Sequence, residues 1–320
     1  MRILSGIQPS GILHLGNFFG MMRPAIALQD RGEAFYFIAD LHALTTVRDP
    51  AALARFSREV AADFLACGLD PARSCFFRQS DVPQVTELAW ILSTLTPMGL
   101  LERCHSFKDK TARGLAASHG LFAYPVLMAA DILIYDSDLV PVGKDQKQHL
   151  EVTRDLAVKF NEAYGPVLKL PEPSIQEAAA VVPGPDGEKM SKSYNNTIGL
   201  FEDEKALRKK IMGIKTDSTP VEAPKPVEKS VILDLYRLVA SPDDTAAMEA
   251  EFRSGGVGYG DFKKRLFAAT WEYFAPFREK RAALAADPSL LDRVLREGAA
   301  RANEAASAVM TRVREAVGLR

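Results

Sequence analysis

The 320-residue sequence has little cysteine and no long apolar run. Its three cysteines, Cys67, Cys75 and Cys104, show no C-x-x-C spacing, which argues against a disulfide framework and against a zinc or iron–sulfur site. No apolar run approaches the roughly 18 residues of a membrane helix, and the first residues lack a basic-then-apolar signal pattern. We therefore expect a cytoplasmic protein with no membrane partner and no structural metal.

The sequence also lacks an excess of charge of either sign. Forty Lys and Arg residues face 41 Asp and Glu residues, which gives a formal net charge of -1. Such a balance provides no global attraction for nucleic acid, so a nucleic-acid partner must be met by local basic patches. At this length, one large domain plus a smaller one is expected.

The first part of the chain alternates predicted strands and helices. Apolar runs predict strands, at residues 1–4, 34–39, 75–79 and 139–142. Periodic segments between them predict helices, at residues 18–29, 50–67, 84–95 and 144–164. Within the apolar segment 121–135, Pro125 should kink or restart any helix. The alternation predicts an α/β fold with a doubly wound parallel sheet of the Rossmann type.

The composition of the sequence changes after Gly165. Proline becomes frequent there, and residues 183–187 form a cluster of turn-forming residues. Beyond Leu200 the patterns predict helices alone, at residues 203–212, 231–240, 243–253, 262–285 and 290–317. An all-helical domain is therefore expected to follow the sheet. The predicted division is a Rossmann-type domain, a connecting loop and a helical domain whose last helix packs back on the first domain, at residues 1–188, 189–196 and 197–320.

A glycine-rich stretch, Ser5 to Asn17, lies at the first predicted strand-to-helix junction. Unpaired N–H groups and the positive end of the helix dipole suit such a junction to an anion. Gly11 and Gly16 allow close backbone approach, and His14 can add a donor to a phosphate. The alternative is that glycine and proline merely mark a turn here.

A second stretch, Lys189-Met190-Ser191-Lys192-Ser193, directly follows the turn cluster. Two lysines three residues apart on flexible flanks can fold over a triphosphate and neutralise charge that develops on a leaving pyrophosphate. Taken alone, a pentamer of this kind is more often a solvated surface loop.

Together the two stretches resemble the signature elements of the class I aminoacyl-tRNA synthetases. Residues 189–193 match the KMSKS loop of that class letter for letter, and His14-Leu15-Gly16-Asn17 is similar to its HIGH element. Three further segments resemble the bacterial tryptophanyl-tRNA synthetases, at residues 5–11, 124–133 and 141–151. The likeness covers nearly the whole chain and is strongest in its first two-thirds.

This resemblance implies activation of L-tryptophan by ATP, with Mg²⁺ accompanying the ATP, and transfer of the tryptophanyl group to tRNA(Trp). It also implies a homodimer. The implied ATP-binding residues are Gln8, Pro9, Ser10, Gly16, Asn17, Gly143, Lys144, Asp145, Val182, Lys189, Met190, Ser191, Lys192 and Ser193. The implied catalytic residues are His14, Asn17, Lys189, Lys192 and Lys110.

For the amino acid, the resemblance implies that Asp131 accepts the hydrogen bond of the indole N–H. A site built around that bond should reject analogues that lack the donor. The other implied tryptophan-binding residues are Tyr124, Met128, Gln146, Val140, Val142, His42 and Leu4. The alternative for Asp131 is a helix-interior carboxylate paired with a nearby base, and for Tyr124 and Met128 it is plain core packing.

In the helical half, three basic clusters are expected to contact tRNA phosphates, within residues 205–215, 263–265 and 278–281. Four residues depart from the family pattern. They are Leu4, where an aromatic residue commonly lines the tryptophan pocket, His14, where many bacterial members carry threonine, Leu41, where glutamine often precedes the histidine, and Lys144, where many relatives carry glutamate. Two other functions stay open, a tyrosine-specific synthetase of the same fold and a non-charging paralogue with a regulatory binding role.

Overall fold

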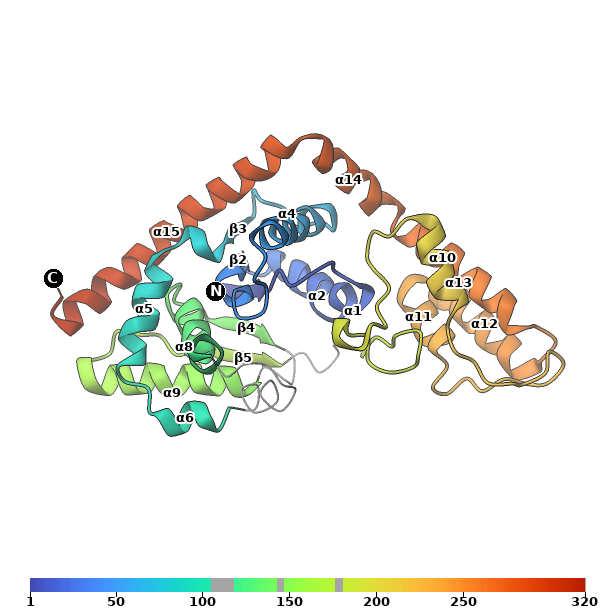
Figure 1. Ribbon diagram of the computed structural model, residues 1–320, viewed down its shortest axis with the longest axis horizontal. Helices are drawn as coiled ribbons and strands as arrows, with labels where there is room; N and C mark the ends of the chain where they lie inside the picture. Colours follow the sequence, from blue (N-terminus) through green and yellow to red (C-terminus); the bar gives the residue numbers. More distant parts are fainter. Residues whose placement is uncertain (105–117, 143–146, 176–180, 320) are drawn as a thin grey trace. The chain divides into compact units, whose positions relative to one another are not determined.

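The structure is a computed structural model, and it describes residues 1–104, 118–142, 147–175 and 181–319 (Figure 1). The chain forms two compact units. The first, called the sheet unit, comprises Met1–Gly11, Ala25–Ala178 and Asp287–Arg320. The second, called the helical unit, comprises Ile12–Pro24 and Ala179–Ala286. Across the described ranges, the helices are too short or too polar to cross a membrane.

The sheet unit is built on parallel strands in the order β3-β2-β1-β4-β5. In chain order these are β1 (Arg2–Ile7), β2 (Glu33–Ile38), β3 (Ser74–Arg78), β4 (Leu139–Val142) and β5 (Glu172–Ile175). The first strand lies between β2 and β4, so the chain winds outward from β1 in both directions. This arrangement confirms the predicted doubly wound parallel sheet.

Strand β5 was absent from the sequence-based prediction. Pro171 and Pro173 argue against a strand there, because proline cannot donate to a ladder. The strand nevertheless pairs with β4, from Leu139 opposite Glu172 to Val142 opposite Ile175. Since β5 lies at the edge of the sheet, one of its sides has no ladder to complete, and proline is tolerated there.

Helices cover the sheet within the same unit. In chain order they are η2 (Leu28–Asp30), α3 (Asp40–Ala43), α4 (Pro50–Ala66), η3 (Gln79–Asp81), α5 (Gln84–Ser93), α6 (Met98–Glu102), α8 (His119–Leu133), α9 (Lys147–Tyr164) and α15 (Pro288–Val317). Of the kink or restart expected at Pro125, the restart is wrong, because α8 is continuous through that residue. Burial explains the difference, because α8 packs against both α5 and α9 and this packing offsets the one hydrogen bond that proline removes.

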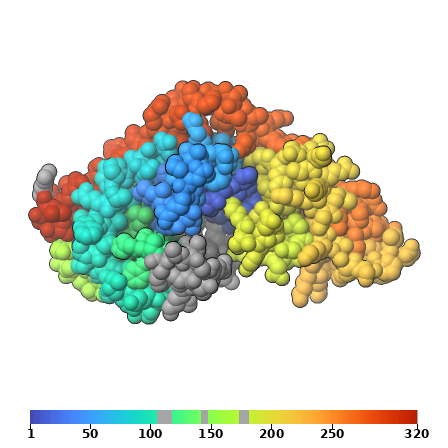
Figure 2. All heavy atoms as spheres, viewed as in Figure 1, coloured from blue at the N-terminus to red at the C-terminus, as the bar shows by residue number. Residues whose placement is uncertain are grey.

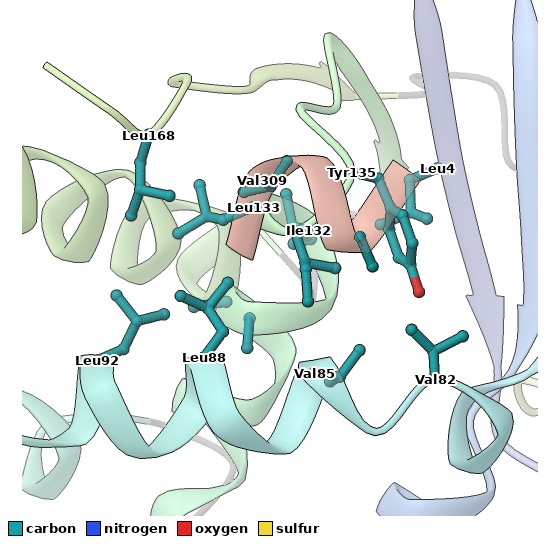
Figure 3. Close-up of a cluster of buried hydrophobic side chains, with 14 of the residues drawn as sticks. Leu4, Val82, Val85, Leu88, Leu92, Ile132, Leu133, Tyr135, Leu168 and Val309 are labelled. Atoms are coloured by element: carbon teal, nitrogen blue, oxygen red, sulfur yellow. The ribbon is translucent and has the colours of Figure 1, made fainter. Parts of the chain in front are cut away.

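The last helix, α15, packs along β3 and α5 at the surface of the sheet unit (Figures 1 and 2). Helix and strand approach so closely that a Cβ atom on Gly298 would lie 1.8 Å from the carbonyl oxygen of Phe76. Val309 of α15 joins Leu88 of α5 and Leu133 of α8 in the main hydrophobic core (Figure 3). The C-terminal helix thereby packs against the edge strand β3.

The helical unit is assembled around α13. Its segments are α1 (Leu15–Asn17), η1 (Phe18–Met22), η5 (Lys192–Tyr194), α10 (Glu204–Met212), α11 (Val231–Val239), α12 (Pro242–Ser254), α13 (Tyr259–Tyr273) and α14 (Ala275–Ala286), while α2 (Arg23–Ala27) leads back to the sheet unit. The single helix predicted at 262–285 is in fact α13 and α14, separated at Phe274. The Phe274 ring is buried against Phe18, 5.1 Å between centroids, which fixes the break.

Candidate active site

The HIGH-like segment begins the first helix of the chain, and its ends cap each other. The backbone N–H of His14 donates to Asn17 Oδ1 at 3.1 Å, and the backbone N–H of Asn17 donates to His14 Nδ1 at 3.3 Å. Because His14 Nδ1 accepts a hydrogen bond, it carries no proton. The ring is therefore held in one orientation at the start of the helix, with Nε2 as its remaining donor.

The KMSKS-like loop is anchored by a buried methionine. Met190 is 3% exposed, and its N–H donates to the carbonyl oxygen of Val182 at 2.9 Å. An isolated bridge joins Pro183 to Lys189 on either side of the preceding turn. Lys189, Lys192 and Ser193 remain exposed. The loop thus presents its lysines to solvent from a fixed base.

The two motifs lie together in the helical unit. A Cβ atom on Gly16 would lie 3.4 Å from Met190 Cβ and 2.9 Å from His14 Nδ1. Two backbone hydrogen bonds, Leu15 N to Ile198 O at 3.0 Å and Leu200 N to Leu13 O at 2.9 Å, tie the HIGH-like segment to the chain just after the loop. Segments far apart in sequence therefore form one site.

Electrostatics agrees with this proximity. Burial, aided by the charge of Lys192, lowers the pKa of His14 to about 4. His14 is consequently neutral at physiological pH and acts as a hydrogen-bond donor through Nε2 rather than as a cation.

Asn196 holds both ends of the KMSKS-like loop and was missed from the sequence. Its side-chain oxygen accepts from Ser191 N at 2.8 Å, and its amide nitrogen donates to Asp186 Oδ1 at 2.9 Å and to Lys189 O at 3.2 Å. The residue is buried directly behind the motif. The signal available was its position, two residues beyond the turn that ends the loop.

Within the sheet unit, polar residues gather where three neighbouring strands end. Gln8 follows β1, His42 follows β2 and Gln79 follows β3. Gln8 Nε2 donates to the His42 carbonyl oxygen at 3.1 Å. The carboxyl ends of parallel strands beside a change in strand order are where open α/β sheets bind ligands.

Asp131 lies at the centre of this group. Tyr124, Met128 and Asp131 occupy one face of α8, because they are spaced four and then three residues apart. Asp131 is 2% exposed, and its Oδ2 lies 2.8 Å from His42 Nε2. Burial raises the pKa of Asp131, while the hydrogen bonds from His42 and Gln79 act in the opposite direction. The contact with His42 is the pairing with a nearby base that the alternative interpretation of Asp131 predicts.

Gln79 is a second residue missed from the sequence. Its amide nitrogen lies 2.7 Å from Asp131 Oδ1 and 2.9 Å from Asp131 Oδ2, and its oxygen accepts from Leu41 N at 3.1 Å. The predicted strand 75–79 contained this residue but assigned it no role. Its place at the carboxyl end of a parallel strand was the available signal.

Other predicted tryptophan-site residues are distributed between this group and the core. Leu4 is 1% exposed and lies beside Tyr135 in the hydrophobic core (Figure 3). Val140 is buried in the same core, and Tyr124 is half-buried with its hydroxyl group hydrogen-bonded to His149 Nε2.

Of the predicted ATP-site residues in this unit, Pro9 is buried and Ser10 is exposed. Several predicted residues lie outside the described ranges: Lys110, Gly143, Lys144, Asp145 and Gln146, with the side chain of Val142.

Several of the predicted tRNA-binding cations have partners in the helical unit. Lys210 Nζ donates to the Thr197 carbonyl oxygen at 2.7 Å and pairs with Glu202, and Arg265 pairs with Glu251 at 2.5 Å. Arg208 remains exposed over the ring of Phe267. The basic clusters thus contain both structural and solvent-facing cations.

Comparison with known proteins shows extensive similarity. Residues 1–275 match the model of the family described as tRNA synthetases class I (W and Y). The chain is 55% identical over 320 residues to a tryptophan--tRNA ligase of Rhodopirellula baltica, with all of both chains covered. It is 52% identical over 319 residues to one of Fusobacterium nucleatum, covering 99% of this chain and 98% of that one.

A solved structure is similar over the same length. The crystal structure of tryptophanyl-tRNA synthetase from Campylobacter jejuni, complexed with ADP and tryptophan, has a TM-score of 0.95 and 49% sequence identity. The similarity covers 99% of this chain and 100% of that chain.

Proposed function

The chain belongs to the family of class I tRNA synthetases for tryptophan and tyrosine, and we propose that it joins L-tryptophan to tRNA(Trp) at the expense of ATP. Relatives at 52–55% identity over the full length are named tryptophan--tRNA ligases. The observation that carries the proposal is the meeting of the HIGH-like and KMSKS-like motifs, with Gly16 against Met190.

In the first step, the tryptophan carboxylate attacks the α-phosphorus of ATP in line. The bond from that phosphorus to the bridging oxygen breaks, and pyrophosphate leaves with its electron pair to give tryptophanyl-adenylate. Such a transfer needs positioning and charge stabilisation rather than a protein nucleophile. In the second step, a terminal ribose hydroxyl of tRNA attacks the carbonyl carbon, and AMP leaves.

Residues of the helical unit are suited to the phosphate end. Lys189 and Lys192 would neutralise charge on the departing pyrophosphate, and neutral His14 would donate from Nε2 to a phosphate oxygen. Mg²⁺ bound to the incoming ATP would add further charge neutralisation. We propose the same phosphate and nucleotide contacts for the remaining predicted residues: Gln8, Pro9, Ser10, Gly16, Asn17, Lys110, Gly143, Lys144, Asp145, Val182, Met190, Ser191 and Ser193.

Residues of the sheet unit are suited to the amino acid. Asp131 would accept the indole N–H, which phenylalanine does not offer, so the site would favour tryptophan. Tyr124, Met128, Val140, Val142 and Leu4 would provide apolar neighbours. We propose that His42 and Gln146 orient the α-amino and carboxylate groups.

The test is amino-acid-dependent exchange of pyrophosphate into ATP across a panel of amino acids. Exchange with tryptophan and with no other amino acid is expected, followed by charging of tRNA(Trp). Exchange with tyrosine instead would overturn the assignment, and tryptophan binding with no charging would indicate a regulatory paralogue. A Lys192→Ala variant with normal adenylate formation would refute the role of the loop.

We further propose that the functional domains are residues 1–188 for ATP and tryptophan, the loop at 189–196 and residues 197–320 for the anticodon. A homodimer in the cytoplasm completes the proposal. Sedimentation at micromolar concentration tests the dimer, and a monomer there would count against it.

A further inference from the structure

The direction of the hydrogen bonds around Gln79 is fixed by the backbone. The N–H groups of Leu41 and His42 lie 3.1 and 3.4 Å from one end of the Gln79 amide, and an N–H group can only donate. That end must therefore be the carbonyl oxygen. The NH₂ group consequently faces Asp131, 2.7 Å from Oδ1 and 2.9 Å from Oδ2.

This orientation dictates what Asp131 can do. Both of its oxygens receive hydrogen bonds from Gln79, and Oδ2 also lies 2.8 Å from His42 Nε2. Donors directed at both oxygens favour the ionised carboxyl group, which accepts hydrogen bonds only and keeps a lone pair for a further donor. Because Gln79 is 1% exposed and Asp131 2% exposed, water does not compete for these contacts.

We propose that Gln79 is a positioning residue that keeps Asp131 a hydrogen-bond acceptor and so makes the amino-acid site specific for a side chain with an N–H donor. The inference rests on the proposed function, in which Asp131 meets the indole. Gln79 acts through Asp131, and the chain of donors runs from the Leu41 backbone through Gln79 to the carboxylate.

The neighbours of Asp131 act on its protonation in opposite directions. Asp40 at the start of α3 lies close enough to raise the pKa of Asp131 and is itself satisfied by Leu41 N and Ser80 N, each at 3.0 Å. Just after α8, the Tyr135 hydroxyl group is buried beside Asp131 and has no hydrogen-bond partner in the described part of the chain. His42 faces Asp131 from α3. Burial and Asp40 favour a protonated Asp131, which loses an acceptor site to its own proton, whereas His42 and, after it, the amide of Gln79 oppose that protonation.

The experiment compares tryptophan with its benzothiophene analogue, in which sulfur replaces the N–H, by pyrophosphate exchange. A Gln79→Met variant keeps the length of the side chain and removes the amide. We expect it to lower kcat/KM for tryptophan roughly ten- to hundredfold. It should leave kcat/KM for the analogue and the KM for ATP nearly unchanged. The preference for tryptophan, which is the ratio of the two kcat/KM values, therefore falls by the same factor.

Gln29→Met is the matched control. Gln29 also bridges backbone groups in the sheet unit, donating to Gly68 O at 3.1 Å and accepting from Asp70 N at 3.0 Å, but does so away from Asp131. The Gln29→Met variant should lower the stability of the protein without changing the preference for tryptophan over the analogue. Equal loss of preference in both variants would show that Gln79 is merely structural and would overturn the proposal.

Gln79→Glu supplies a readout that packing alone would not move. When protonated, the new carboxyl group donates to Asp131 as the amide does, and when ionised it repels Asp131. We expect kcat/KM for tryptophan to fall between about pH 6 and 9 in this variant relative to the parent protein. A pH profile parallel to that of the parent would contradict the proposal.

Asp131→Leu separates the inference from its premise, because leucine is of similar size and offers no hydrogen-bond acceptor. If this variant keeps the parent preference for tryptophan, Asp131 does not meet the indole and the premise fails together with the inference. If it abolishes the preference while Gln79→Met retains it, Asp131 keeps its role and the proposal for Gln79 alone is overturned.

Discussion

Lys192 lies close enough to His14 that its charge adds to burial in lowering the pKa of His14 to about 4. This relationship joins the two motifs electrostatically as well as sterically. A neutral histidine beside a lysine lets both act as donors to the same polyphosphate without mutual repulsion. Because the folded protein disfavours a protonated His14, its stability should depend on pH.

The first prediction concerns that dependence. The unfolded chain binds a proton at His14 below its ordinary pKa of 6.5, whereas the folded chain does so only near pH 4. Stability contributed by neutral His14 is therefore present above pH 6.5 and is lost as the pH falls towards 4, to a total of about 3 kcal/mol. Urea denaturation from pH 7.5 down to about 4 measures it.

A His14→Asn variant retains a good helix cap and removes the titrating ring. Its urea midpoint should fall less steeply with decreasing pH than that of the parent protein. Parallel curves for the two proteins would contradict the depressed pKa of His14.

The second prediction concerns Gly16→Ala. The new Cβ would lie 2.9 Å from His14 Nδ1 and 3.4 Å from Met190 Cβ, so either the histidine or the KMSKS-like loop must shift. A displacement of this kind at reacting groups is expected to lower kcat for pyrophosphate exchange by at least about tenfold. Gly20→Ala in the same helical segment is the control, because nothing lies within 4 Å of its Cβ position. Equal rates in the two variants would argue against the close approach.

Much of the fold follows from local patterns, and the exceptions have a common cause. The runs at 34–39 and 75–79 predict β2 and β3 because strands covered on both faces are apolar throughout. Strand β5 escapes that pattern because its edge position, a property of the whole sheet, tolerates Pro173. Helix α8 continues through Pro125 for a similar reason, since packing by α5 and α9 outweighs local propensity.

The residues of the candidate site also fall into two groups, those that local sequence identifies and those that it does not. Motif letters identify His14 and Lys189 to Ser193, because these residues lie in short segments with fixed spacing. Gln79 and Asn196 carry no such signal, since their partners are backbone groups and carboxylates brought near by folding. Their positions, at the end of a strand and after a turn, were visible in the sequence, but the partners that give them an orienting role appear only in the structure.

The third prediction concerns Asn196. Asn196→Ala removes hydrogen bonds to Ser191, Asp186 and Lys189 and should free the loop at both ends. We expect adenylate formation to slow about ten- to hundredfold, with KM for tryptophan unchanged and stability lowered by about 1–3 kcal/mol. Single-turnover kinetics and urea denaturation measure the two effects.

Asn161→Ala is the matched control for this loss. Asn161 also makes three hydrogen bonds, to the backbone groups Val167 N, Leu168 N and Leu168 O, but in the sheet unit. It should lower stability to a similar extent and leave adenylate formation intact. Slow adenylate formation in Asn161→Ala, or adenylate formation at the parent rate in Asn196→Ala, would contradict a specific role of Asn196 in the loop.

The fourth prediction concerns the contact of α15 with β3. In Gly298→Ala the new methyl group would lie 1.8 Å from the Phe76 carbonyl oxygen, and because this atom is strand backbone, the helix must move away. That movement also weakens the contact from Cys75 Sγ to the Gly298 carbonyl oxygen at 3.1 Å. The expected loss is about 1–3 kcal/mol in the free energy of unfolding.

Gly120→Ala is the control, because Gly120 lies in a helix and nothing lies within 4 Å of its Cβ position. This variant should instead be neutral or stabilising by up to about 1 kcal/mol. If Gly298→Ala were as stable as Gly120→Ala, the last helix would not pack on β3 as closely as Gly298 requires.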